Sequence, residues 1–325
     1  MSDIKKIIDS SIWADRTKKA RISFISKLRD ELDPTSKGLN FLKDYDLVSE
    51  FLLNKYTNPS TRKNRVLDIR AVLNLIKDDK TIKKYDLLNQ TLINDDEEYR
   101  GNNVVKDKSR FIPYEELLIL PKKIEDNIKF VYGKLFLSHS EIDNLKSKQA
   151  KYKYMKVLIE YIVSILYIKE PPVRSDWATV LLDHPFDNQN WFDSKKGIIY
   201  WNQFKNVKGF GKKEFKLSNI TISNLKHYIE VLKYIIDPNP GYLIYQIKSS
   251  SYQQFTREKF SSYFKTINEK YLHKPLTIND YRHIYESHII NDPNYNKLTI
   301  NEKRAIHEKL LHSVSTATEY VKVEE

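Results

Sequence analysis

The chain has 325 residues, 40% hydrophobic and 30% charged, which is enough apolar material for about two folded domains. It has no cysteine and only seven glycines, which excludes disulfides and thiolate metal sites and leaves no glycine-rich phosphate loop. The sequence has no apolar run long enough to span a membrane, and its charged first residues do not resemble a signal peptide.

The charge balance indicates a polyanionic partner. Lysine and arginine number 55 against 43 aspartates and glutamates, which gives a formal net charge of +12 and a pI near 9.3. Among polyanions, nucleic acid is the commonest partner of a basic chain. A solvated basic surface that binds nothing in particular is the alternative.

The first third of the chain predicts a small helical unit. Apolar residues recur at helical spacing over 41–53 and again over 58–77, where Pro59 and Ser60 are start signals. The second of these helices carries a basic stripe opposite its apolar face, which we predict to contact DNA: Arg62, Lys63, Arg65 and Arg70. A solvated face explains this stripe equally well.

The remainder predicts a mainly helical domain with one β-hairpin. A strongly apolar helix over 150–168 is stopped by two prolines, and the hairpin pairs 197–204 with 213–218. Three further helical patterns follow, at 221–236, 256–271 and 299–311. Two tryptophans are predicted core residues and four histidines structural ones: Trp177, Trp201, His139, His184, His227 and His307.

These patterns divide the chain into four parts. We predict an N-terminal extension over 1–14 and a helical domain over 15–95. A polar, charged linker over 96–110 leads to a second domain over 111–325.

Several residues of the second domain suit phosphodiester chemistry. Two arginines can clamp phosphate oxygens bidentately, and a lysine or histidine can protonate a leaving oxygen. A tyrosine can attack as a covalent nucleophile once its proton has an acceptor, and nothing in the set requires a metal. In chain order the set is Arg174, Lys205 with Lys208 beside it, Arg282 with His283, His312 and Tyr320.

These segments, together with the helical first domain, resemble the tyrosine recombinase (phage integrase) family, in the form found in large eukaryotic DNA viruses and their mobile elements. The resemblance is carried by FLKDYDLVSEFLL with NPSTRKNRVLDIRAVLNLIK in the first domain, and by PPVRSDW, NQFKNVKGFGKKEFKL, DYRH and LLHS…TEY in the second. Each piece alone is common, but their order and spacing are typical of the family.

The resemblance implies a helical core-binding domain and a catalytic domain that clamp duplex DNA. It implies metal- and ATP-independent breaking and rejoining of DNA, with no cofactor, through a 3′-phosphotyrosine on Tyr320. Arg174 and Arg282 would hold the phosphate, His312 would add a hydrogen bond and Lys205 would be the general acid. It also implies a homotetramer on two DNA sites, acting wherever the target DNA is.

Two departures from the family pattern bear on activity. The family has histidine three residues before the second arginine, where this chain has Asn279, which cannot act as a base. His283 or His273 could compensate. Tyr320 also follows His312 by eight residues, one fewer than the commonest bacterial spacing.

Alternatives remain for the site and for the function. Arg174 and His312 could cap helices, Lys205 and Lys208 could be solvated turn residues, and Tyr320 could be a surface residue of the tail. A type IB topoisomerase shares the phosphotyrosine chemistry. A catalytically inactive DNA-binding protein of the same fold is the third possibility.

Overall fold

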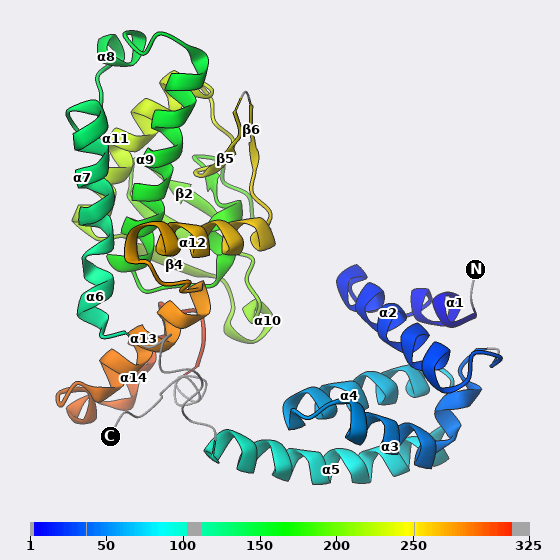
Figure 1. The fold of residues 1–325 in the computed structure, drawn as a ribbon. Coiled ribbons are helices and arrows are strands. Elements are labelled where there is room, and N and C mark those ends of the chain that lie inside the picture. Colours follow the sequence, from blue (N-terminus) through cyan, green and yellow to red (C-terminus); the bar gives the residue numbers. More distant parts are fainter. Residues whose placement is uncertain (1–2, 37, 103–111, 250, 314–325) are drawn as a thin grey trace. The chain divides into compact units, whose positions relative to one another are not determined.

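The computed structural model describes residues 3–36, 38–102, 112–249 and 251–313. The chain divides into two compact units, Met1–Lys106 and Asp107–Glu325, called here the N-terminal and C-terminal units (Figure 1). Both are rich in helices, and the described strands are few and short, which confirms the predicted mainly helical class. Among the described helices, none combines the length and apolar character needed to cross a lipid bilayer.

The N-terminal unit is a bundle of helices around one apolar core. Its elements are α1 Asp3–Asp9, α2 Asp15–Leu32, η1 Asn40–Lys43, α3 Tyr45–Lys55, α4 Pro59–Leu75 and α5 Asp79–Asn102. Asn58 caps α4 by accepting a hydrogen bond from the Thr61 amide, and Pro59 occupies the first turn, where its missing N–H costs nothing. The helix predicted over 58–77 is therefore confirmed within two residues of its end.

Two boundaries of this unit differ from the predicted ones. Ile4 and Ile8 of α1 are fully buried in the unit's core, so residues 3–9 belong to the bundle and not to an extension. The linker was predicted from residue 96, but α5 continues to Asn102. The charged run that looked like a linker is a helix surface, and one of its acids, Asp96, turns inward to pair with Lys63 of α4.

The C-terminal unit is built around α9, Lys148–Ile168, where every residue from Leu158 to Ile168 is buried. Long helices α7 (Leu120–Tyr132) and α11 (Asn219–Ile235) pack against it (Figure 1). The remaining helices are α6 Tyr114–Leu118, α8 His139–Asp143, η3 Ser175–Thr179, α10 Val207–Phe210, α12 Arg257–Leu272, α13 Ile278–Asn291, η4 Tyr295–Lys297 and α14 Ile300–Glu308.

A four-stranded sheet of order β1-β2-β3-β4 covers part of this core. Its strands are β1 Leu181–Leu182, β2 Trp191–Asp193, β3 Ile198–Trp201 and β4 Lys213–Lys216. The predicted hairpin is the antiparallel pair β3–β4, with Ile199 opposite Phe215. The prediction of a single hairpin is wrong, because β1 and β2 extend the sheet and a second hairpin joins β5 Tyr245–Ile247 to β6 Tyr252–Gln254.

The two tryptophans predicted as core residues are both 2% exposed and pack edge to face, 4.9 Å between ring centroids. Trp177 lies in η3 and Trp201 ends β3, so their contact ties the segment after Arg174 to the strand before Lys205.

Candidate active site

Helix α13 carries four of the polar residues of the site. The helix starts with a capping box, in which Thr277 and Asp280 exchange hydrogen bonds of 2.7 and 3.2 Å between side chain and backbone. Residues three and four apart share a helix face. The members of this face are Asn279, Arg282, His283 and Glu286.

Arg282 is fully buried and joins two distant segments of the chain. Its Nη1 donates to the carbonyl oxygen of Pro172 at 2.7 Å and to that of Leu310 at 3.2 Å. Pro172 lies two residues before Arg174, and Leu310 lies two residues before His312. The Arg282 guanidinium thus brings together the three chain segments that contain Arg174, Arg282 and His312.

The backbone at Arg174 is held by a hydrogen bond from Tyr167, and the Arg174 side chain is half-buried. The hydroxyl of Tyr167, in the last turn of α9, donates to the Arg174 carbonyl at 2.8 Å. Two residues on, Asp176 is 4% exposed and pairs with Arg257 of α12 at 2.9 Å. Burial raises the pKa of Asp176, against the opposing attraction of Arg257, Arg174 and Arg282.

Arg257 also reaches the strand end that precedes Lys205. Its Nη2 lies 3.3 Å from the carbonyl oxygen of Gln203, and Asn190 bonds both backbone groups of Gln203, at 2.9 and 2.8 Å. Lys205 follows this fixed position with an exposed side chain. Lys208 is also exposed, inside the short helix α10 of the turn.

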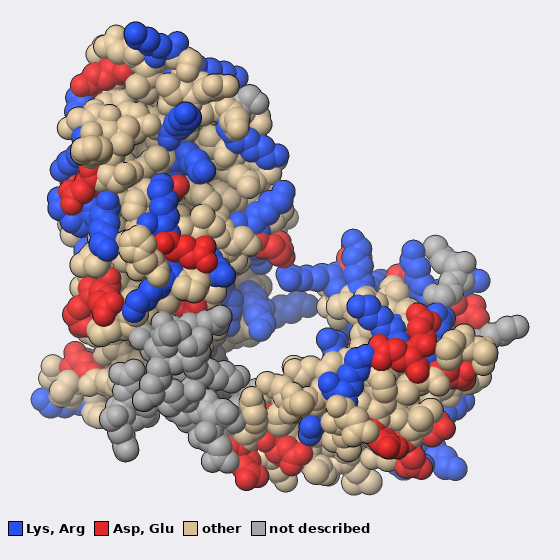
Figure 2. Space-filling view, viewed as in Figure 1, with Lys and Arg blue, Asp and Glu red and all other residues tan. Residues whose placement is uncertain are grey.

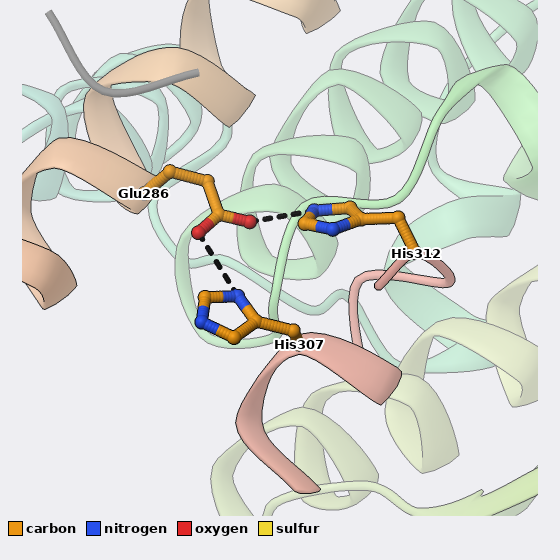
Figure 3. A group of neighbouring side chains, drawn as sticks. All are labelled: Glu286, His307 and His312. Carbon is orange, nitrogen blue, oxygen red and sulfur yellow. Dashed lines mark ion pairs between the residues drawn. The ribbon is translucent and has the colours of Figure 1, made fainter. Parts of the chain in front are cut away.

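His312 lies fully buried after a sharp turn. Leu311 before it has a φ of 58°, in the left-handed region that costs a residue with a side chain about 1 kcal/mol. His312 Nε2 is 2.6 Å from Glu286 Oε1, and its Nδ1 is 3.0 Å from the Ser313 carbonyl oxygen. His307 of α14 reaches the other carboxylate oxygen, with Nδ1 3.1 Å from Oε2 (Figure 3). The three side chains come from α13, α14 and the following turn.

Opposing effects act on the Glu286 carboxyl. Burial by itself raises its pKa, but interactions with His307 and His312 outweigh this and hold the pKa below the ordinary value of 4.5. Glu286 is therefore ionised at neutral pH, although its side chain has no exposure to solvent.

The same three residues also lie close enough together to be compared with the geometry of a metal site. Among the described residues, Glu286, His307 and His312 bring possible ligand atoms within 4.8 Å of one another. A zinc ion bound at 2.0–2.1 Å would hold its tetrahedral ligands roughly 3.3 Å apart. The carboxylate–histidine distances of 2.6 and 3.1 Å are shorter, so these residues fit a direct ion pair better than a bridging metal.

Asn279 and His283 lie together at the exposed side of α13. Asn279 Nδ2 is 3.2 Å from His283 Nε2, so an imidazole lies next to the Asn279 amide. His273, the other predicted substitute, is exposed at the end of α12 with a φ of 58°.

The predicted nucleophile, Tyr320, lies outside the described residues.

The four cations predicted to contact DNA all have partners within the N-terminal unit. Lys63 pairs with Asp96, Arg70 with Asp86, and Arg65 with Asp68 at 3.3 Å, while Arg62 donates to the Tyr56 carbonyl. They remain half-buried and not fully solvated. Figure 2 shows Lys and Arg spread over the visible faces of both units, with Asp and Glu interspersed.

Glu286, His307, Asp176 and Arg257 were missed as site residues. His307 was predicted to be structural, and its full burial agrees, but its contact with Glu286 was not foreseen. Two sequence signals were available. Glu286 lies one helical turn beyond Arg282, and Asp176 lies close to Arg174 in the chain, two residues after it.

Comparisons with known proteins give little further information. No family model and no curated protein matches the sequence. A solved structure of XerA recombinase is similar, with 12% identity and a TM-score of 0.42 over 99% of this chain and 93% of that chain. Identity and TM-score are both low, so the functional argument rests on the site itself.

Proposed function

We propose that this chain cuts and rejoins duplex DNA through a covalent 3′-phosphotyrosine, as a recombinase or integrase. The observation that carries the proposal is Arg282, whose buried guanidinium binds the segments that lead to Arg174 and to His312. Two arginines and a histidine at one place suit the charge that develops on a phosphate during displacement. Tyr320 enters as the nucleophile on the family resemblance.

In this mechanism the Tyr320 hydroxyl oxygen attacks the scissile phosphorus while the bond to the 5′ oxygen breaks. Arg174 and Arg282 hold the non-bridging oxygens, and His312 donates one further hydrogen bond. Lys205 gives a proton to the leaving 5′ oxygen, because an alkoxide leaves poorly without one. His283, next to Asn279, accepts the tyrosine proton, and Asn279 hydrogen-bonds the phosphate or the hydroxyl.

Rejoining reverses these steps. A 5′-hydroxyl from a partner strand attacks the phosphotyrosine and gives its proton to Lys205, while the bond between phosphorus and the tyrosine oxygen breaks and His283 returns a proton to Tyr320. One phosphodiester is exchanged for another, so the reaction needs neither ATP nor a cofactor. Strand exchange between two duplexes requires four active sites, which corresponds to a tetramer assembled on two DNA sites.

The proposed role is integration of a viral or mobile element, wherever its target DNA lies: a host nucleus, a viral factory or a bacterial cytoplasm. The net charge of +12 supports a DNA partner.

A suicide substrate tests the function. A duplex of the element's terminal sequence, nicked just beyond the cleavage point, loses its short 5′-hydroxyl fragment and traps the covalent complex. We expect an adduct that survives denaturation, and a joined product when a partner strand with a 5′-hydroxyl is added.

The other outcomes identify the alternatives. Ready relaxation of a supercoiled plasmid that lacks the site would indicate a type IB topoisomerase. Specific DNA binding with no adduct would indicate an inactive DNA-binding protein.

A further inference from the structure

A cleft in the C-terminal unit gathers three lysines that the mechanism above does not use. It has a volume of about 490 Å³ and lies between the N-terminal half of α9 and the turn of the β5–β6 hairpin (Figure 1). None of the residues that line it is acidic. Its polar lining consists of Gln149, Tyr152, Lys153 and Lys156 from α9, and Lys248 and Ser249 from the hairpin.

The walls of the cleft are fixed by the fold. On α9 the lining residues recur every three or four positions between 149 and 156, so they share one helix face. The hairpin turn is closed by a backbone hydrogen bond of 2.7 Å from the Lys248 amide to the Ser251 carbonyl oxygen. Tyr252 of β6 packs edge to face against Tyr152 of α9, with 6.5 Å between the ring centroids. The lysines of the two walls therefore line one space without any rearrangement of the backbone.

The cleft lysines have no acidic partner within the chain. In the part of the chain that the structure describes, no carboxylate lies within ion-pair distance of Lys153, Lys156 or Lys248. Glu160, one turn beyond Lys156 on α9, is buried and paired with Lys270 at 2.8 Å. The basic stripe of α4 differs, because each of its four cations has a partner in its own unit. The charge of the cleft is therefore open to an anion from outside the chain.

Hydrogen-bonding capacity indicates which anion fits. A lysine ammonium only donates, and the tyrosine and serine hydroxyls and the glutamine amide of the lining can donate as well. A phosphodiester carries one negative charge, and its oxygens only accept hydrogen bonds. The phosphates of a nucleic acid backbone therefore match this lining.

The cleft is close enough to Arg174 for one duplex to occupy both places. Tyr167, whose hydroxyl binds the Arg174 carbonyl oxygen, lies 14 residues after Lys153 on α9. At roughly 1.5 Å per residue, the separation along the helix is about 21 Å. One turn of duplex DNA is about 34 Å long. A backbone bound at Arg174 can therefore also reach the cleft within one turn.

We propose that the cleft binds backbone phosphates of the duplex that the chain cuts, less than one helical turn from the cleaved phosphate. The inference rests on the proposed function for the identity of this duplex. Lysines hold phosphates as point charges, and contacts to phosphates read no base edges. The contact therefore adds the same affinity on any sequence, and it positions the duplex without entering the chemistry.

The salt dependence of DNA binding tests the contact. The full chain and a cleft variant, Lys153→Gln with Lys156→Gln and Lys248→Gln, bind a duplex of arbitrary sequence about three helical turns long over a series of salt concentrations. Each lost phosphate contact makes the slope of log affinity against log salt shallower by about 0.9, so we expect the slope to change by about 2–3. All three lysines are exposed, so the circular dichroism spectrum and the thermal midpoint should be unchanged.

The matched control removes the same charge elsewhere in the C-terminal unit. Lys195→Gln with Lys226→Gln and Lys233→Gln also replaces three exposed lysines, so its net charge equals that of the cleft variant. A general effect of net charge would alter both slopes equally, and we expect a change below about 1 in the control. Single-turnover cleavage of the suicide substrate at saturating protein should stay within about twofold in both variants, because a contact made equally before and during the reaction changes affinity and not the chemical step.

Neutral phosphates locate the contact. A methylphosphonate is placed at one position at a time, within one turn on either side of the cleavage point of the suicide substrate. At the contacted positions it should weaken binding by the unsubstituted chain and leave binding by the cleft variant unchanged, because the two changes remove the same interaction. Equal weakening of the two proteins at every position would overturn the inference.

The outcomes separate this inference from the proposed function. If the unsubstituted chain forms no adduct while only the cleft variant has the shallower slope, the proposed function fails and binding of DNA by the cleft stands. If adducts form and the cleft variant has the slope of the control, the inference fails alone. Inorganic pyrophosphate is the probe for a small anion. Calorimetric binding of pyrophosphate that is lost in the cleft variant, with equal DNA slopes for the cleft variant and the control, would also overturn the inference.

Discussion

Arg282 and Arg174 are both assigned to the phosphate, but the structure surrounds them differently. Arg282 is fully buried and bonded to two carbonyl oxygens, whereas Arg174 is half-buried. Lysine keeps the charge of either residue and loses the planar fork. We expect single-turnover cleavage to fall at least ~100-fold in Arg174→Lys and in Arg282→Lys, as when one oxyanion donor is removed.

Stability distinguishes the two variants. Arg282→Lys should also lower the free energy of unfolding, because at least one of the carbonyl bonds is lost in the core, while Arg174→Lys should leave it nearly unchanged. A near wild-type cleavage rate in either variant would mean that this arginine is structural.

Two exposed lysines are candidates for the general acid: Lys205, in the turn just after the hydrogen-bonded Gln203, and Lys208, in the short helix α10. A sulfur at the 5′ bridging position leaves without a proton, since a thiol has a pKa near 8.5. Lys205→Ala should therefore cut normal DNA very slowly and the sulfur substrate at close to the unsubstituted rate. Lys208→Ala should show a mild defect that is the same on both substrates.

The reverse pattern would exchange the two roles. Failure of sulfur to rescue either variant would point to His283 or His312 as the proton donor.

The order of the motifs made some of these residues predictable and others not. Arg174, Arg282 and His312 were predicted from linear order, and the bonds of Arg282 connect their segments. The helix position of Glu286 could be read from the sequence, but its pairing could not, because its partners His307 and His312 lie 21 and 26 positions further along the chain, across a turn whose path the sequence does not specify. Such a pairing is decided by tertiary packing and leaves no local pattern.

At the scale of elements, a nearly buried ion pair joins α4 to α5. It gives Lys63, one of the four cations predicted to contact DNA, a role in holding the two helices together. Asp96 is 1% exposed and its partner Lys63 is 20% exposed. Removal of one partner leaves a charge in a poorly solvated place, at a cost of about 3 kcal/mol. We expect Lys63→Ala to lower the free energy of unfolding of the full chain by about this amount, as measured by urea denaturation.

The control is the exposed Lys83 of α5, where alanine should change stability by less than about 0.5 kcal/mol. If Lys63→Ala matched this control and mainly weakened DNA binding, the lysine would serve DNA contact and not the fold.

Two kinds of element escaped prediction for physical reasons, very short strands and a helix that buries polar side chains. Strands of two or three residues, such as β1 and β2, are too short for apolar alternation to be visible. Helix α13 buries Arg282 and Glu286 on its inner side, so its apolar periodicity is broken where the site requires polar groups. Three helices with an apolar inner face, α9, α11 and α12, were predicted within two residues at each end.

At the scale of the whole molecule, the surplus of positive charge should govern DNA affinity. Each phosphate neutralised releases counterions, so the logarithm of affinity should fall with the logarithm of salt concentration, with a slope of about −0.9 per contact. Because arginine and lysine supply the positive charge of the mechanism, cleavage should persist in EDTA. Loss of cleavage in EDTA, with the circular dichroism spectrum unchanged, would contradict a metal-independent reaction.

The central claim is that Tyr320 becomes covalently joined to a 3′ phosphate, and one measurement tests it most directly. The adduct from the suicide substrate is digested with trypsin, and mass spectrometry locates the nucleotide-bearing residue, in parallel with Tyr320→Phe. The account predicts that the nucleotide is on Tyr320, and that the phenylalanine variant forms no adduct while binding DNA within about twofold of the unsubstituted chain. An adduct in Tyr320→Phe, or a nucleotide on any other residue, would contradict it.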